Sequence, residues 1–350
     1  MREPTDGRYE RGSPWRKLLV SGGALLGAAA AYNAFAKKGV NQLANLIGGE
    51  EGGFEWRDWR IAFTKRGNGP PVLLIHGIHA AAWSYEWRNN VDYLARSNTV
   101  YTIDLLGFGR SSRPPIRYSA RLYISLISDF VARVIGEPCV LIASSLSGAY
   151  AAVLAARDPQ RFPALVLIAP TGLVRLNQPA SLKGEAGRFA VDAPIAGTAM
   201  FNALVSRRNL QIYLRRTYAD DALVTRELVE TYYTASHQRG ARHAPAAFLS
   251  GHLNIDVRNA IRRLMQPSML VWGEEGSIAP VEEFRGFTAL KPDFELSVLS
   301  PAGDLPHDER SEDFNVIVST WLNRLSLSSA PTQNTPPGMP AASPPTPLHS

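Results

Sequence analysis

A serine at a sharp strand-to-helix transition is the residue best placed for chemistry. The apolar run Cys139–Ile142 leads into small residues and then into the helix-forming segment Ala149–Arg157. Such a transition presents its apex at the carboxyl end of a strand and the amino end of a helix, where free amide groups hold an oxyanion. We therefore expect the hydroxyl of Ser145 to act as a nucleophile. In the alternative interpretation, Ser144, Ser145 and Ser147 only cap the helix.

This segment resembles the nucleophile elbow, G-x-S-x-G, of the α/β-hydrolase superfamily. Here it reads Ala143-Ser144-Ser145-Leu146-Ser147, so alanine and serine replace the two glycines, and Gly148 follows one place later. The resemblance implies that the backbone N–H of Leu146 donates to the oxyanion. The serine nucleophile separates the chain from dehalogenases and epoxide hydrolases, which use aspartate at this place.

Two further loops carry the same resemblance. The first, His76-Gly77-Ile78-His79, follows the continuous apolar run Val72–Ile75, as expected after a fully buried parallel strand. The resemblance implies that His76 and Gly77 shape this loop and that the N–H of Ile78 is the second oxyanion donor. His79 faces either the pocket or solvent. The second loop, Asp104–Ser111, matches D-x-x-G-x-G-x-S, in which the aspartate is structural.

The base and the acid of a catalytic triad are missing from their usual places. A serine hydroxyl needs a base within hydrogen-bond reach, normally a histidine oriented by a carboxylate. Relatives commonly read W-G-x-x-D after the penultimate strand, whereas this chain has Gly276 at the aspartate position. They read G-H-x-P-H after the last strand, where Asp304 replaces the first histidine and His307 retains the second.

Three outcomes follow from these replacements. In the first, His307 is the base through a shifted loop and Glu275 or Glu274 orients it. In the second, Asp304 itself transfers the proton, although a carboxylate with a pKa near about 4 is a weak base unless burial raises that pKa. In the third, turnover is lost and the pocket only binds a ligand. We therefore expect a serine hydrolase for an ester-like or small apolar substrate, with a catalytically impaired ligand-binding protein as the alternative.

The surrounding segments predict the α/β-hydrolase fold, with a mostly parallel central sheet and helices on both faces. The core spans residues 54–170 and 267–325, and begins with a hairpin over 54–66 that turns near Arg57-Asp58. Helical patterns without strands fill residues 171–266, which we interpret as a helical cap inserted after the sixth strand. Residues 39–53 read as a linker and the Pro-rich residues 326–350 as a disordered tail.

The amino-terminal region has three interpretations. After a polar head (1–17), residues 18–38 form an uncharged Ala/Gly/Leu-rich stretch closed by two lysines, about as long as a minimal membrane span. It is expected to be a membrane anchor, which would make the protein membrane-associated. Alternatively it is a signal peptide with Ala34-Phe35-Ala36 as the cleavage site, or a helix packed on a cytoplasmic or secreted protein.

The composition of the chain limits the kinds of molecule that it is expected to bind. The net charge of +6 comes from dispersed arginines, and no basic run interleaved with aromatic residues indicates nucleic-acid binding. A single cysteine, Cys139, excludes an intramolecular disulfide. The histidines show no metal-ligand spacing, so we expect no metal and no cofactor, and a small molecule as the partner. The oligomeric state is left open.

Overall fold

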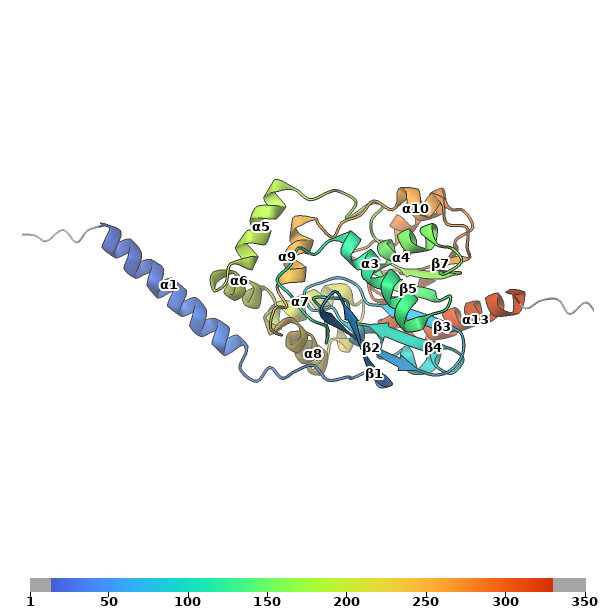
Figure 1. Ribbon diagram of the computed structural model, residues 1–350, viewed down its shortest axis with the longest axis horizontal. Coiled ribbons are helices and arrows are strands. Elements are labelled where there is room, and N and C mark those ends of the chain that lie inside the picture. The colour runs from blue at the N-terminus through green and yellow to red at the C-terminus, as the bar shows by residue number, and fades with distance from the viewer. Residues whose placement is uncertain (1–13, 330–350) are drawn as a thin grey trace, which may run out of the picture.

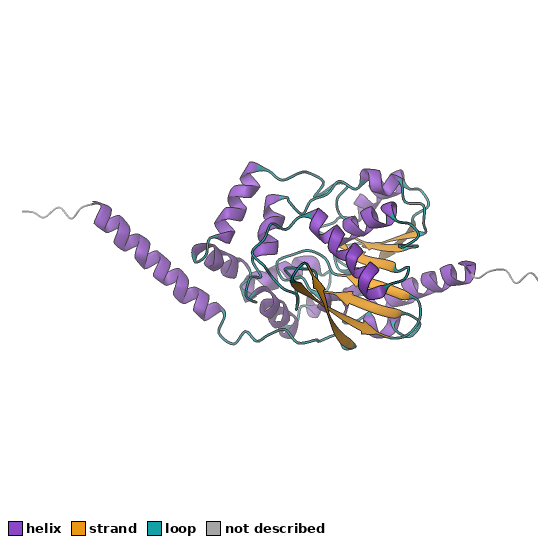
Figure 2. Ribbon diagram, in the orientation of Figure 1, coloured by secondary structure: helices purple, strands orange, loops and turns teal. Residues whose placement is uncertain are grey.

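The computed structural model describes residues 14–329, and its centre is an eight-stranded sheet in the order β1-β2-β4-β3-β5-β6-β7-β8 (Figures 1 and 2). β1 pairs with β2 and β2 with β4 in antiparallel fashion, and all other neighbours are parallel. The strands are β1 Glu50–Trp56, β2 Trp59–Arg66, β3 Pro71–Ile75, β4 Thr99–Ile103, β5 Val140–Ser144, β6 Leu165–Ile168, β7 Ser268–Gly273 and β8 Glu295–Leu299.

Both faces of the sheet are covered by helices, which is why its inner strands are continuously apolar. Alternate residues of β3 point to opposite faces: Leu73 joins the cluster under α3 and α4, and Leu74 joins Trp87 and Trp321 under α2 and α13. The helices of the core are α2 Val91–Leu94, α3 Ala120–Phe130 with a π-helical turn at Val131–Ile135, α4 Ser145–Arg157, α11 Phe284–Leu290, α12 Pro306–Glu309 and α13 Ser311–Ser329. Short 3-10 turns lie at Ser84–Trp87, Asp221–Leu223 and Val281–Glu283.

The amino-terminal hairpin forms as predicted but begins earlier. Arg57 and Asp58 have positive φ angles of 49° and 67°, which suit a two-residue hairpin turn. Strand β1 starts at Glu50, so residues 50–53 belong to the sheet and the predicted linker over 39–53 is too long. Glycine suits β1 here because the ring of Phe63 on β2 occupies the space of a side chain. A Cβ on Gly52 would lie 2.0 Å from that ring.

Helices α5 to α10 follow β6 and precede β7, as expected for a cap inserted after the sixth strand. They are α5 Leu182–Asp192, α6 Ala196–Leu204, α7 Arg207–Thr217, α8 Arg226–Ser236, α9 His243–Ser250 and α10 Arg258–Arg262. The cap has a hydrophobic cluster of its own, which includes Phe201, Leu214 and Tyr232. Helix α10 packs instead on α4 and α11, and its Ile261 belongs to the cluster of the core. The arrangement is the α/β-hydrolase fold that the sequence predicts.

Two carboxylates of α12 fasten the cap to the core. The buried carboxylate of Asp308 accepts hydrogen bonds from Arg88 (2.8 Å) and from the hydroxyl of Tyr218 at the end of α7. Its neighbour Glu309 accepts from two backbone amides of the cap, at 2.7 and 2.8 Å. The carboxyl end of α7 is therefore held against the loop that follows β8.

Helix α1 (Pro14–Ala36) runs beside the cap, and its amino-terminal half projects away from the body (Figure 1). Asn33 donates to the carbonyl of Ile195 at 3.0 Å and accepts from Asn202 at 2.9 Å, while the carbonyl of Ala36 accepts from Tyr233 at 2.6 Å. Across residues 14–329, no helix has both the length and the apolar composition needed to cross a bilayer. The expected transmembrane helix over 18–38 is therefore not supported. Residues 1–13 of the predicted polar head and 330–350 of the predicted tail lie outside the described residues.

Candidate active site

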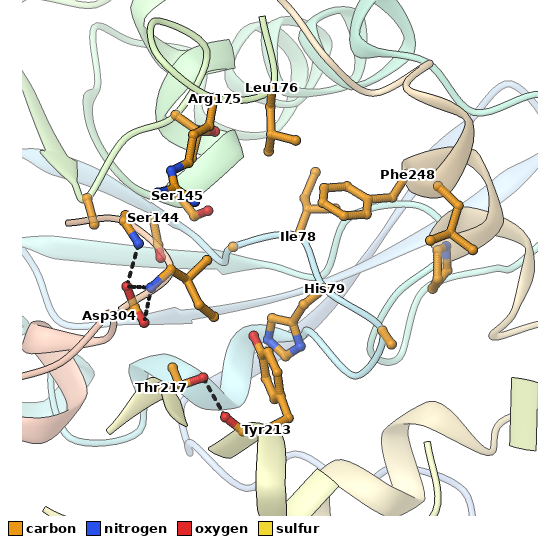
Figure 3. Close-up of a pocket in the computed structure, with 18 of the residues that line it drawn as sticks. Ile78, His79, Ser144, Ser145, Arg175, Leu176, Tyr213, Thr217, Phe248 and Asp304 are labelled. Atoms are coloured by element: carbon orange, nitrogen blue, oxygen red, sulfur yellow. Dashed lines mark hydrogen bonds between the residues drawn. The ribbon is translucent and has the colours of Figure 1, made fainter. Parts of the chain in front are cut away.

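A cavity of about 440 Å³ lies between the carboxyl ends of the strands and the cap (Figure 3). Most of its walls are apolar, with a few polar groups from the segments that follow β3, β5, β6 and β8 and from α7. Polar side chains on its surface are His79, Glu86, Ser144, Ser145, Thr171, Arg175, Tyr213, Thr217 and Asp304. Apolar side chains include Ile78, Leu176, Val191, Phe201, Leu204, Phe248, Leu249, Ile278 and Leu305. Such a cavity suits a small ligand that is mainly apolar.

Ser145 occupies a strained turn between β5 and α4. Its φ angle is +52°, in the left-handed region that side chains rarely adopt, and the residue is half-buried on the cavity surface. Ser147, which replaces the second glycine of the motif, donates a hydrogen bond from its hydroxyl to the carbonyl of His76 at 2.6 Å. Gly148 is the close-approach position, because a Cβ there would lie 3.3 Å from the carbonyl oxygen of Ala143. The displaced glycine therefore still allows the helix to pass near the strand.

The two predicted oxyanion donors come from the loop after β3 and from the first turn of α4. Ile78 lines the cavity next to Gly77, and Leu146 is the second residue of α4. Neither backbone N–H donates a hydrogen bond to another residue of the described chain. A Cβ on Gly77 would lie 3.3 Å from the hydroxyl oxygen of Ser144, so the loop passes close to the elbow. The roles of Ile78 and Leu146 as donors stay a prediction.

His76 and Glu86 fix the loop that carries Gly77 and Ile78. His76 is fully buried, its Nε2 accepts from the N–H of Leu105 at 3.0 Å, and its Nδ1 donates to the carbonyl of Gly77 at 2.6 Å. Both carboxylate oxygens of Glu86 lie 3.1 Å from the N–H of Gly77, which donates to them. These contacts fix the backbone that presents Ile78.

Asp304, which the resemblance places at the position of the base, lines the cavity. Its carboxylate accepts hydrogen bonds from the amides of Ile278 (3.0 Å) and Ala279 (2.8 Å), and its own N–H donates to the carbonyl of Thr217 at 2.7 Å. Burial raises the pKa of Asp304 above its usual value, and the amide hydrogen bonds oppose that rise. A Cβ on Gly276 would lie 3.2 Å from Oδ1 of Asp304. Position 276, where the motif has its acid, is therefore next to the carboxylate of Asp304.

His307 does not line the cavity, in contrast to its predicted role as the base. Its ring is fully buried, with centroid distances of 4.4 Å to Trp87 and 5.8 Å to Phe314. Nε2 lies 3.4 Å from Oε1 of Glu86, without hydrogen-bond geometry, and neither ring nitrogen bonds to Ser145 or another described residue. The aromatic packing explains this placement, because it holds the imidazole on the side of Glu86 that faces away from the cavity.

Glu275 also lies away from the cavity. Its side chain is exposed, and Oε2 accepts a hydrogen bond from the amide of Ala302 at 2.7 Å. Glu274 is exposed as well and does not line the cavity. The structure therefore does not bring Glu275, His307 and Ser145 together as a rebuilt triad.

Two cavity residues were not assigned a role from the sequence. His79 lines the cavity, stacks on Tyr232 at a centroid distance of 5.7 Å and lies next to Tyr213 (Figure 3). Burial lowers its pKa to about 4, so the ring is neutral near pH 7.

Glu86 is almost fully buried. Burial raises its pKa, but the neighbouring imidazoles, above all His307, outweigh that effect and hold the pKa below its usual range. The only sequence signal for Glu86 is an acidic residue between aromatic neighbours.

Three hydroxyl groups at the centre of the site are free to meet a ligand. Those of Ser144 and Thr171 are buried without a hydrogen-bond partner in the described structure. That of Ser145 likewise forms no hydrogen bond within the described residues. Unpartnered buried hydroxyls are rare, so their presence on one cavity wall indicates a polar ligand group at this point. No group of three or more His, Cys, Asp or Glu residues within 14–329 could hold a metal ion.

Comparisons with known proteins agree with this architecture. Residues 70–311 match the model of the family described as alpha/beta hydrolase fold. A 2-hydroxy-6-oxo-6-(2'-aminophenyl)hexa-2,4-dienoic acid hydrolase from Metapseudomonas resinovorans is 27% identical over 282 residues, covering 78% of this chain and 89% of the relative. A meta-cleavage product hydrolase structure from Pseudomonas fluorescens superposes with a TM-score of 0.65 at 22% identity, covering 79% of this chain and 99% of the other. A membrane phospholipase A structure gives a TM-score of 0.63 at 22% identity, covering 88% and 96%.

Proposed function

The chain belongs to the alpha/beta hydrolase fold family, and we propose that it is a hydrolase that uses Ser145 to cleave an ester-like bond in a small, mainly apolar substrate. The observation that carries the proposal is the left-handed conformation of Ser145 at the cavity surface, with φ +52°. A non-glycine residue in this conformation costs about 1–3 kcal/mol and persists only where its surroundings enforce it. Strain of this kind at a cavity wall supports a functional position for the hydroxyl.

The mechanism follows from the groups around the serine. Oγ of Ser145 attacks the substrate carbonyl carbon, and the N–H groups of Ile78 and Leu146 stabilise the oxyanion that forms. Asp304 accepts the serine proton and passes it to the leaving oxygen, after which water releases the acyl group by the same steps. The amides of residues 277–279 orient the Asp304 carboxylate, which is the task of the acid in an ordinary triad. The raised pKa of Asp304 supports this role.

The substrate class rests on the cavity wall and on the relatives. Phenylalanine and leucine side chains make up much of the wall, including Phe201, Phe248 and Leu204. The relative from M. resinovorans is named for a substrate with an aminophenyl group, and the phospholipase for a lipid. We therefore expect a carbonyl compound that carries an aromatic or aliphatic group of moderate size.

A second candidate function is ligand binding without turnover. It is favoured by the carboxylate of Asp304, which already accepts hydrogen bonds from three backbone amides. These bonds stabilise the ionised form and make the carboxylate a weaker base. The buried His307 offers Ser145 no other base.

Labelling with a fluorophosphonate probe separates the two functions. The native chain should react with the probe and hydrolyse p-nitrophenyl esters slowly, and Ser145→Ala should lose both activities because the attacking oxygen is gone. Asp304→Asn should retain the fold and lose ester turnover by at least about 10²-fold, as expected when a general base is removed.

The control is ligand binding measured on the same proteins with a non-hydrolysable ester analogue. Loss of labelling in Ser145→Ala with unchanged analogue binding supports the enzyme. If the native chain binds the analogue but neither labels nor turns over any ester, the second function is correct.

A further inference from the structure

An exposed apolar surface lies on the cap where helices α5, α6 and α9 pack together. Leu182 is 91% exposed and Phe189 is 65% exposed on α5, and Met200, Leu204 and Leu249 on α6 and α9 are exposed as well. These five residues are called the cap rim below. Helix α5 contacts both α6 and α9, and all three lie at one side of the molecule (Figure 1). Large apolar side chains that cluster on a surface mark a site of interaction.

Two residues of the cap rim also line the cavity. Leu204 and Leu249 line the cavity and are exposed to solvent at the same time, so they form part of its mouth. Arg175 also lines the cavity and has a half-exposed side chain, which is paired with Glu283. A molecule that covers the cap rim is therefore in direct contact with the entrance to the Ser145 site.

Helix α1 adds exposed apolar side chains next to α6. Its carboxyl-terminal part contacts α6 through Asn33 and Asn202, yet Leu25 and Phe35 are exposed by 73% and 75%. Tyr233 of α8 fixes the end of the helix through its bond to Ala36. The helix therefore presents apolar side chains beside the cap rim instead of burying them against the cap.

The cap as a whole carries an excess of positive charge, although α5 itself is balanced, with Lys183 and Arg188 against Glu185 and Asp192. Residues 171–266 contain 13 Arg and Lys against 7 Asp and Glu, a difference of +6 that equals the net charge of the whole protein. Exposed lysines flank the apolar side chains: Lys37 and Lys38 directly follow α1, and Lys183 follows Leu182. Apolar side chains bordered by cations are complementary to an anionic bilayer surface, where the first insert among lipids and the second meet phosphate groups.

We propose that the cap rim and helix α1 dock on the surface of an anionic lipid bilayer, so that the cavity mouth opens toward the lipid. The surface association does not require a helix that spans the bilayer. An amphiphile can then pass from the bilayer into the cavity without crossing water. A second copy of the chain fits the same surface less well, because pairing would bring two positively charged caps together.

Sedimentation with vesicles tests this inference on the full-length chain. Vesicles of phosphatidylcholine with phosphatidylglycerol should carry the protein into the pellet, and vesicles of phosphatidylcholine alone should bind at least tenfold less. The double variant Leu182→Ser/Phe189→Ser should lower the partition coefficient for the mixed vesicles at least tenfold. Neither residue lines the cavity.

The matched control is Val298→Ser/Val316→Ser, which removes two exposed apolar side chains from β8 and α13, outside the cap. It should change the partition coefficient less than twofold, and thermal melts should show both double variants folded. Equal binding to both kinds of vesicle, or equal losses in both variants, overturns the proposal. Two results together would assign the surface to a second copy of the chain: the native chain does not bind vesicles, and light scattering shows a dimer that the Leu182→Ser/Phe189→Ser variant does not form.

Discussion

At the scale of single residues, the resemblance to the superfamily's motifs implies two exchanges relative to an ordinary triad. Asp304 stands where the motif has a histidine, and Gly276 stands where it has an aspartate. The two positions lie next to each other in the structure. An aspartate at position 276 would place a second carboxylate against Asp304, and its Cβ would lie only 2.7 Å from the carbonyl oxygen of Ala279. Glycine leaves the backbone amides of 277–279 free to bind Asp304.

Restoring both residues should rebuild the triad once the 276–279 loop has shifted to relieve the contact with the carbonyl of Ala279, whereas restoring one should not. Gly276→Asp/Asp304→His should hydrolyse p-nitrophenyl esters at least about 10²-fold faster than the native chain, because loss of one triad member typically costs about 10⁴-fold. Each single variant should gain less than about tenfold. Adding Ser145→Ala to the double variant is the control and should abolish the gain. A folded double variant with no gain would show that the elbow is not competent for catalysis.

The strain at Ser145 makes a second, independent prediction. Ser145→Gly should raise the free energy of unfolding by about 0.5–1 kcal/mol, because glycine adopts positive φ angles without steric cost. Ser145→Ala retains the Cβ and should leave the stability nearly unchanged. Urea unfolding of the three proteins measures the difference. Equal stabilities for the glycine and alanine variants would mean that the turn stores no strain.

At this scale the sequence located the turn that carries Ser145, whose role stays a prediction, and it misplaced the side chain of His307, which packing positions. The position of Ser145 follows from a strand and a helix joined by a short turn. The placement of His307 could not be read in this way, because the rings of Trp87 and Phe314 come from distant segments and determine which way the imidazole points. Glu86 was missed for the same reason.

At the scale of elements, periodicity predicted the central strands and the hairpin, but it placed the start of β1 too late. Gly52 and Gly53 read as a linker, yet they pair with Phe63 and Ala62 of β2. The missing side chains leave room for the ring of Phe63, a cross-strand contact that no local pattern reveals. The end of an edge strand therefore depends on its partner more than on its own sequence.

Two glycines of the cap form a matched pair for testing how its helices pack. A Cβ on Gly197 of α6 would lie 2.3 Å from the carbonyl oxygens of Ala190 and Val191, whereas nothing lies within 4 Å of a Cβ on Gly187 of α5. Gly197→Ala should lower the free energy of unfolding by about 1–3 kcal/mol through overpacking. Gly187→Ala should raise it by about 0.5–1 kcal/mol, since alanine is the better helix former.

Thermal or chemical denaturation of the two variants checks this prediction, and hydrogen exchange shows whether the loss in Gly197→Ala is confined to α5 and α6. The opposite order of stabilities would contradict the close packing of α5 on α6.

At the scale of the whole molecule, the buried His237 and the half-buried His79 should make the protein sensitive to mild acid. Burial lowers the pKa of His79 and of His237 to about 4, below the value of about 6.5 expected when unfolded. The unfolded chain therefore binds more protons between pH 6.5 and 4. Stability is fully present above pH 6.5 and falls as the pH drops through this window, by about 1–3 kcal/mol for each histidine.

Urea unfolding at pH 7.5, 5.5 and 4.5 measures this loss. His237→Gln should remove part of the dependence over this window, since a neutral side chain cannot be protonated, while the contribution of His79 remains. Parallel pH profiles for the native chain and His237→Gln would show that this imidazole titrates normally.

One contact between cap and core has a consequence for the timing of a catalytic cycle. The N–H of Asp304 donates to the carbonyl of Thr217, and the hydroxyl of Ser277 donates to that of Arg216, each at 2.7 Å. The proposed proton acceptor, Asp304, is thus held by hydrogen bonds to the last turn of α7. If α7 moved outward to let substrate in, it would draw Asp304 away from Ser145. Substrate entry and proton transfer would then have to occur one after the other.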